Sequence, residues 1–233
     1  MIINIEPGTF GGPLRMGDLL GVGNVVEYIR KINNNPLIQF HIKMAAISEE
    51  LHCRHFYFWL INNTNYFTVD EGTQSLPWNK VNVWDFRDIS GDLVTIPNKY
   101  TQIKKIVISP LFDAPYNTYR NWPKEVFDKI ISDYSKYPDF YDKVILSKTP
   151  MDIPGWRNCT DILESLNHIM TAEVYIGGDT GLSHFAGALD KGPEPIYYTS
   201  SRGLLHTTPF NWMTKNKGTM KTYWLDFEGT KWA

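Results

Sequence analysis

The sequence predicts an α/β fold made of two domains, each built from parallel strand–helix–strand units. The chain has 233 residues and 42% hydrophobic residues, enough for one large or two small domains with substantial cores. Apolar strand patterns alternate with amphipathic helix patterns from residue 103 onwards. A polar segment at 97–102 indicates a linker, so we expect domains at 1–100 and 101–233.

The first half begins with a strand at 2–5 and a glycine-rich loop at 7–13. A helix pattern opens at Asp18, where apolar residues recur at helical spacing, and a second strand is expected at 37–42. Residues 48–61 fit a helix by spacing and a strand by aromatic content, and further strands are predicted at 66–69 and 81–86.

The second half has a more regular alternation. Pro123 is suited to the first turn of a helix, and an apolar face follows it through Tyr134. A further helix is expected over 162–170 and another from about Thr180. Strands are predicted at 103–109, 144–146, 174–176 and 195–198.

The turn between the strand at 174–176 and the following helix has the sequence Gly-Gly-Asp-Thr-Gly-Leu-Ser-His over residues 177–184. Backbone N–H groups at a helix N-terminus bind anions, and phosphate is the expected biological anion. Asp179 is suited to cap this helix, and Gly181 allows a ligand close to the backbone. A capped helix start without a ligand is the alternative interpretation.

Composition and charge indicate an ordinary soluble protein, with a formal net charge of −2 and 21% charged residues. No apolar run is long enough to span a membrane, and no basic region precedes the apolar N-terminus. We therefore predict a cytoplasmic location. Cys53 and Cys159 fit no metal-ligand spacing and are interpreted as reduced thiols. The chain favours Ile, Asn, Lys, Tyr and Phe, which suggests an AT-rich genome, as many bacteriophages have, and we expect a bacterial or phage-infected cell as the host.

Residues 202–233 carry five Lys or Arg and two Asp or Glu, interleaved with aromatic residues. Such interleaving is compatible with nucleic-acid binding. A packed C-terminal segment with solvated lysines is the alternative, and the overall negative charge favours it.

Four segments together resemble glycosyltransferase family 9, the heptosyltransferases of lipopolysaccharide synthesis. Near the N-terminus, Met16-Gly17-Asp18-Leu19-Leu20 is similar to the Gly-Asp motif of that family. The strand at 106–110 with the Arg-Asn-Trp-Pro segment at 120–123, and the helix at 161–172, are similar to consecutive pieces of its C-terminal domain. Residues 178–184 resemble its Asp-Ser/Thr-Gly-x-x-His signature. The resemblance covers 1–32 and about 103–200.

This resemblance implies a GT-B fold, in which two Rossmann-like domains face each other across a cleft. The domain at 101–233 would bind a nucleotide-diphosphate sugar, and a shortened domain at 1–100 would hold the acceptor. The reaction would be inverting transfer of the sugar to an acceptor hydroxyl. The acceptor is either a glycan or, given the phage-like composition and basic tail, a hydroxymethylated base in DNA. Residues 43–100 match nothing in the family, so the acceptor pocket is unassigned.

The resemblance also assigns roles to individual residues. Asp18 would be the catalytic base, with a helix cap as the alternative. Arg120 would clamp the diphosphate where the family has a lysine, and a surface arginine stacked near Trp122 is the alternative. Thr180 and Gly181 would offer backbone N–H groups to the phosphates. Asp179 and His184 complete the expected donor site, although a structural histidine is a further alternative.

No Asp-x-Asp motif occurs in the sequence, and the histidines show no metal-ligand spacing. The sequence therefore predicts a metal-independent transferase without a cofactor, in which cations and helix N–H groups stabilise the leaving diphosphate. A non-catalytic protein that binds a nucleotide or nucleotide sugar is the competing hypothesis. In that case Asp18 only stabilises its helix.

Overall fold

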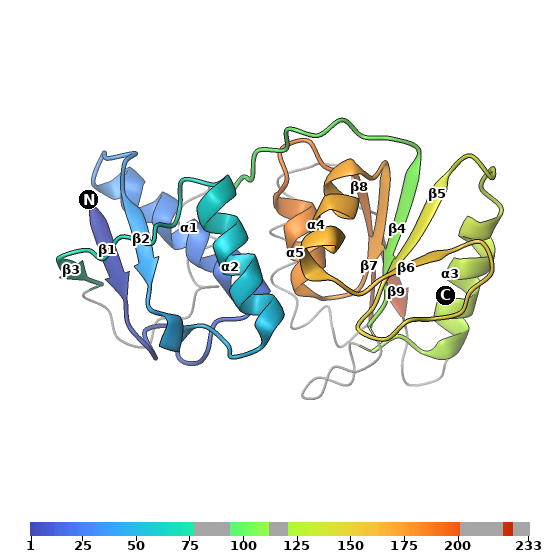
Figure 1. Ribbon diagram of the computed structural model, residues 1–233, viewed down its shortest axis with the longest axis horizontal. Coiled ribbons are helices and arrows are strands. Elements are labelled where there is room, and N and C mark those ends of the chain that lie inside the picture. The colour runs from blue at the N-terminus through green and yellow to red at the C-terminus, as the bar shows by residue number, and fades with distance from the viewer. Residues whose placement is uncertain (77–93, 112–120, 201–220, 226–233) are drawn as a thin grey trace. The chain divides into compact units, whose positions relative to one another are not determined.

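The computed structural model describes residues 1–76, 94–111, 121–200 and 221–225 (Figure 1). The chain divides into two compact units, Met1–Pro97 and Asn98–Ala233. The strand expected at 81–86 and most of the basic C-terminal segment lie outside the described residues. Among the helices of the described ranges, none combines the length and the apolar character that a membrane span requires.

The first unit contains a parallel sheet with strand order β2-β1-β3. The central strand β1 (Ile2–Ile5) pairs with β2 (Gln39–Ile42) in the register Ile2 to Gln39, and with β3 (Gln74–Ser75) on its other side. Helix α1 (Met16–Ile32) connects β1 to β2, and buries an apolar stripe that includes Leu19, Val22, Val26 and Ile29. A short 3-10 helix, η1 (Met44–Ala46), follows β2.

Two expectations for the first unit are corrected or resolved. Residues 48–61, which the sequence left open, form most of helix α2 (Leu51–Asn63), because Cys53, Phe56, Tyr57 and Leu60 recur at helical spacing and are buried. The strand predicted at 66–69 is wrong, since Phe67 makes only an isolated bridge to Phe40. The predicted start of α1 at Asp18 is two residues late.

The second unit contains a six-stranded parallel sheet with strand order β6-β5-β4-β7-β8-β9. All expected strands and helices in the described part of this half are confirmed with small shifts at their ends. The strands are β4 (Lys105–Ser109), β5 (Asp142–Leu146), β6 (Arg157–Cys159), β7 (Val174–Gly177), β8 (Glu194–Ser200) and β9 (Lys221–Leu225). The helices are α3 (Lys124–Ser135), α4 (Ile162–Thr171) and α5 (Gly181–Ala188).

Helices cover both faces of this second sheet (Figure 1). Helix α3 packs through Val126, Phe127 and Ile130 on one face, against alternate residues of β4, β7 and β8. The intervening residues point to the other face, where α4 and α5 lie. There the Tyr197 hydroxyl donates to the Ser183 carbonyl oxygen of α5. The Tyr175 hydroxyl shares a hydrogen bond with Ser183 Oγ. The buried strands therefore read as continuous apolar runs, as parallel strands covered on both sides do.

Candidate functional site

The second sheet reverses its direction of growth between β4 and β7. From β4 the chain adds β5 and β6 on one side, and then β7, β8 and β9 on the other. Connections that leave the adjacent carboxyl ends of two such strands depart to opposite faces, which leaves a crevice where ligands bind in open α/β sheets. Ser109 and Gly177 are paired at this position. The turn singled out in the sequence, at 177–184, therefore lies at the topological switch point.

Both glycines of this turn are required by their neighbours. A Cβ on Gly177 would lie 2.5 Å from the Tyr175 hydroxyl oxygen and 2.5 Å from Ser183 Oγ. A Cβ on Gly178 would lie 2.9 Å from Nε1 of Trp122. Real Cβ atoms do not approach other atoms this closely, so a side chain at either position would force these neighbours to shift.

Trp122 joins the start of α3 to this turn. Its indole is 3% exposed, packs against Gly178 and donates from Nε1 to the Tyr198 carbonyl oxygen at 3.2 Å. Its backbone N–H donates to the carbonyl of Leu111, in the segment after β4. Two segments that the sequence analysis treated as separate motifs are thus in direct contact. The Trp-Pro pair in the sequence does not predict this packing role, because only the fold brings Gly178 beside it.

Thr180 is the N-cap of α5, where Asp179 was expected. Its backbone is extended, and its Oγ1 accepts the backbone N–H of Ser183 at 3.3 Å. The prediction that Asp179 caps the helix is therefore wrong by one residue. Within the described ranges, the backbone N–H groups of Gly181 and Leu182 make no hydrogen bond, and both residues are partly exposed. Two N–H groups at the positive end of α5 are available to an anion.

A layer of buried hydroxyl groups supports this turn from below. Tyr175 and Ser183 place their oxygens 2.9 Å apart, and Ser183 Oγ lies 3.3 Å from Thr180 Oγ1. The Tyr197 hydroxyl donates to the Ser183 carbonyl oxygen at 3.0 Å. Complete burial raises the pKa of both tyrosines, so they remain neutral hydrogen-bonding groups. A tyrosine within an apolar strand pattern was the only sequence signal for this layer.

Asp179 and His184 contact each other across the turn. His184 Nε2 lies 3.6 Å from Asp179 Oδ1, and the two side chains are 5% and 12% exposed. The contact ties the residue before the cap to the first turn of α5. His184 is thus brought to the turn as expected, but beneath it, with its side chain buried.

Asp18 occupies the comparable place in the first unit. It lies in the first turn of α1, which follows the carboxyl end of β1, and is half-buried. Its Oδ2 accepts the backbone N–H of Arg15 at 3.0 Å. The carboxylate therefore stabilises the start of its own helix, as one alternative interpretation anticipated, although from the third helical position and not from the N-cap.

Arg120 lies outside the described residues, as do 201–220 and 226–233 of the basic C-terminal segment. Within the described residues, the candidate site therefore consists of the Gly177–Thr180 turn, the N–H groups of Gly181 and Leu182, and Trp122. This arrangement can bind an anionic group, because it presents N–H donors at a helix start and excludes side-chain bulk.

Comparisons with known proteins agree with this architecture. No family model matches the sequence, and no curated protein matches it significantly. The structure is similar to that of ADP-heptose LPS heptosyltransferase II from E. coli, with a TM-score of 0.50 and 11% sequence identity. The similarity covers 95% of this chain and 89% of that chain. The predicted α/β fold of the GT-B type is confirmed by this likeness, which at such low identity concerns the fold alone.

Proposed function

We propose that this protein transfers a sugar from a nucleotide-diphosphate sugar to an acceptor hydroxyl. The observation that carries the proposal is the pair of N–H groups on Gly181 and Leu182 at the switch point of the second sheet. A diphosphate fits such a site because the helix dipole and the two donors favour negative charge. The fold likeness to a heptosyltransferase supports the choice of a sugar nucleotide as the ligand.

In this proposal the donor diphosphate lies across the start of α5, with Thr180 and Gly181 beneath it. Arg120 supplies a guanidinium to the leaving phosphates, and it precedes by two residues the tryptophan that packs on Gly178. Asp179 and His184 hold the turn through their mutual contact. Asp18 removes the proton of the acceptor hydroxyl, and the sugar is transferred with inversion and without a metal ion at the diphosphate.

A nucleotide-sugar binding protein without transferase activity is the second candidate. The observation that favours it is the hydrogen bond from the Arg15 N–H to Asp18, because it gives this carboxylate a structural task. Both candidates share the same donor site, so nucleotide binding does not distinguish them. They differ in whether Asp18 acts as a catalytic base.

Donor binding is tested by the thermal unfolding of the full chain with a panel of nucleoside diphosphates. A ligand at about 100 times its dissociation constant adds about 2.7 kcal/mol to the free energy of unfolding, which raises Tm measurably. Arg120→Ala should abolish this rise. Lys124→Ala is the matched control, because it removes an exposed cation four residues away that pairs with Asp128 one turn further along α3. A wild-type protein that no nucleoside diphosphate stabilises would refute the donor site.

Asp18→Asn separates catalysis from helix capping. Asparagine keeps a side-chain oxygen that accepts the Arg15 N–H, but it does not take a proton from a hydroxyl. If Asp18 is the base, turnover of the donor falls by about 10²–10⁴-fold while Tm and donor affinity stay close to wild type. Unchanged turnover of Asp18→Asn would instead establish that Asp18 only stabilises α1.

The proposed acceptor is a glycan hydroxyl, which the fold likeness to a heptosyltransferase supports, and a hydroxymethylated DNA base is the other outcome of the same assay. Transfer of labelled sugar is compared on oligosaccharides and on DNA that carries hydroxymethylated bases. Salt-dependent binding of the DNA would accompany the second outcome, because contacts to phosphates release counterions.

A further inference from the structure

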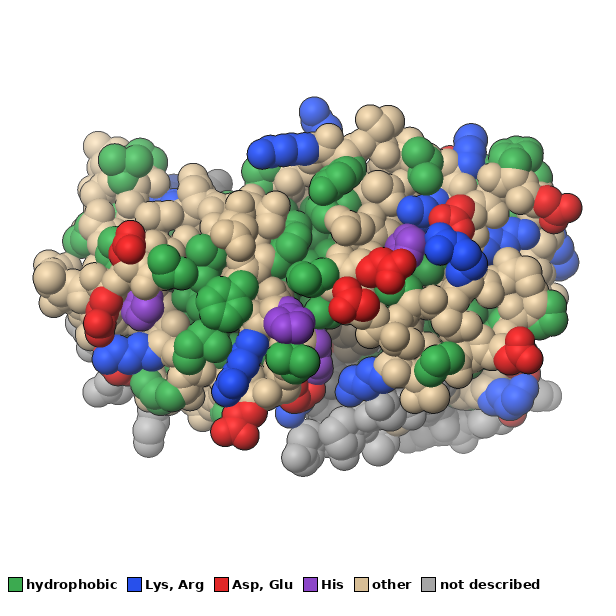
Figure 2. Space-filling view, in the orientation of Figure 1, with side chains coloured by type: hydrophobic (Ala, Val, Ile, Leu, Met, Phe, Trp, Pro, Cys, Tyr) green, Lys and Arg blue, Asp and Glu red, His purple; other side chains and the backbone are tan. Residues whose placement is uncertain are grey.

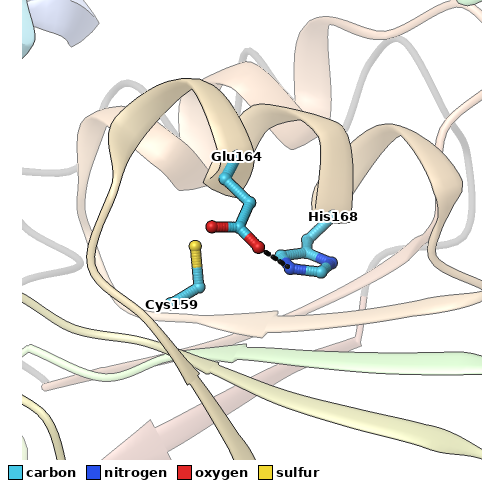
Figure 3. A group of neighbouring side chains, drawn as sticks. All are labelled: Cys159, Glu164 and His168. Carbon is cyan, nitrogen blue, oxygen red and sulfur yellow. Dashed lines mark ion pairs between the residues drawn. The ribbon is translucent and has the colours of Figure 1, made fainter.

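Three potential metal ligands meet beside α4, away from the proposed donor turn. Cys159 stands at the carboxyl end of β6, and Glu164 and His168 occupy adjacent turns of α4 (Figure 3). One ligand atom from each residue lies within 4.8 Å of the other two. Figure 3 shows the Glu164 carboxylate between the Cys159 thiol and the His168 imidazole. The thiol also lies 3.4 Å from the Asp161 carbonyl oxygen and 3.4 Å from Ser165 Oγ. Glu164 and His168 are four residues apart on one helix, but Cys159 joins them only when α4 packs beside β6, so the sequence does not indicate this group.

One imidazole nitrogen of His168 makes no hydrogen bond within the described part of the chain. Its Nε2 is buried and makes no hydrogen bond to any described residue, and the residue is 8% exposed. This nitrogen faces Glu164, whose Oε1 lies 3.4 Å away. The other nitrogen, Nδ1, lies 3.3 Å from Lys105 Nζ. A buried polar nitrogen without a partner is costly, and a metal ion would remove that cost.

The spacing agrees with tetrahedral coordination. With metal–nitrogen and metal–oxygen bonds of about 2.0–2.1 Å, the two ligand atoms of a tetrahedral zinc ion stand roughly 3.3 Å apart. The 3.4 Å between Nε2 and Oε1 is therefore close to the required value. The Cys159 sulfur, which lies within 4.8 Å of the other two ligand atoms, must come slightly closer to them for all three to bind one ion. Glu164 accommodates this, because its side chain is 58% exposed and has freedom to move.

We propose that Cys159, Glu164 and His168 bind a zinc-class divalent cation, with water as the fourth ligand. Sulfur, imidazole nitrogen and carboxylate oxygen together are a donor set that zinc accepts and that magnesium and calcium do not favour. The ion links the three-residue edge strand β6 to α4. Its role is to stabilise this side of the second unit, and it takes no part in donor binding.

Two cationic side chains lie near the three ligands and share one carboxylate. Arg157 contacts Asp142 through Nε at 3.0 Å and Nη2 at 2.8 Å, and Lys105 lies 3.8 Å from the same side chain. The charge of a divalent cation would therefore be offset by the ligands themselves, the Cys159 thiolate and the Glu164 carboxylate. Figure 2 shows acidic, basic and histidine side chains lying beside one another on this face of the unit. On binding, the thiol of Cys159 releases its proton to solvent. A metal ion on Nε2 requires the His168 ring proton to be on Nδ1, and Lys105 then stays protonated and donates to Thr171 Oγ1 at 2.7 Å.

Cobalt(II) titration of the reduced, untagged full chain tests the site, because a thiolate ligand gives an intense charge-transfer band in the near ultraviolet. We expect the band to saturate at one equivalent of Co²⁺, and Zn²⁺ to displace it. Cys159→Ser should abolish the band. Cys53→Ser is the matched control, since Cys53 is also a buried free thiol but belongs to the other unit.

Glu164→Gln provides a second variant that does not disturb the core, because the side chain is exposed. We expect it to weaken Zn²⁺ binding at least tenfold in competition with a chromophoric chelator, and to abolish the rise of Tm that Zn²⁺ causes in the wild type. Glu125→Gln, at an exposed position of α3, should leave both readouts unchanged. Absence of the cobalt band in the wild type, or its loss in Cys53→Ser and not in Cys159→Ser, would overturn the proposal. Equal Zn²⁺ affinity of Glu164→Gln and wild type would overturn it too.

Discussion

Gly178→Ala tests whether the contact between Trp122 and the donor turn is as tight as the structure has it. The new Cβ would lie 2.9 Å from Trp122 Nε1 and 3.5 Å from both Trp122 Cε2 and Leu111 Cβ. The backbone of Gly178 is not left-handed, so alanine is strained by its neighbours and not by its own φ. The indole has little freedom to move, because it is 3% exposed and holds the Tyr198 carbonyl oxygen at 3.2 Å.

The magnitude follows from two opposing effects. Overpacking of a well-filled core costs about 1–3 kcal/mol. Replacing glycine by alanine reduces the entropy of the unfolded chain and returns about 0.4–1 kcal/mol. The net loss should be about 1–2 kcal/mol, which lowers Tm by roughly 2–8 °C for a protein of this size.

Calorimetric unfolding of Gly178→Ala should be compared with that of Gly12→Ala. A Cβ on Gly12 meets nothing within 4 Å, so that variant carries the entropic effect without the clash. We expect Gly12→Ala to unfold at or slightly above the wild-type Tm. If Gly178→Ala and Gly12→Ala unfold at the same temperature, the packing of Trp122 on the turn is not as described, and the link between the two motifs is lost.

Two further predictions concern the second unit. Thr180→Val removes the Oγ1 that accepts the Ser183 N–H, and it should lower the free energy of unfolding in urea by about 0.5–2 kcal/mol. Thr180→Ser keeps a hydroxyl and should retain most of the stability. Equal stabilities of the two variants would contradict the cap. Burial would raise the pKa of Asp142, but the hydrogen bonds and charge of Arg157 outweigh it and lower that pKa below 3.8. The ionised carboxylate therefore stabilises the fold above pH 3.8, and this contribution is lost as pH falls through the lowered pKa. Acid unfolding followed by circular dichroism should be less steep for Asp142→Asn below about pH 4, and identical slopes would contradict the Arg157–Asp142 pair.

Periodicity located the second sheet well because its strands are covered on both faces. Runs such as Val174–Gly177 are apolar throughout, and glycine or proline bounds most of them. The short edge strand β6 has no such signal, since Arg157 and Asn158 are polar and exposed. In the first unit, residues 48–61 fitted a helix by spacing and a strand by aromatic content. The burial of one helical face in the structure identifies most of them as part of α2.

The candidate site was predicted in part for the same kind of reason. A strand followed by Gly-Gly-Asp-Thr-Gly is a local signal, so the turn and the helix start could be located from the sequence. The identity of the cap could not, because Asp179 and Thr180 are both good N-caps and the contact of Asp179 with His184 decides between them. Contacts between distant segments, such as that of Trp122 with Gly178, depend on strand order, which the sequence does not state locally.

Strand order also explains why small residues are concentrated where the ligand is proposed to bind. At the switch point, β4 is followed in the chain by α3 on one face of the sheet, while β7 is followed by α5 on the other face. The space between them is filled from one side by the Trp122 indole and from the other by the Tyr175 and Ser183 hydroxyls. Side chains at 177 and 178 would compete for that same space, so glycine at both positions lets the turn pack without displacing these neighbours. Close packing and anion binding therefore depend on the same two glycines of this turn.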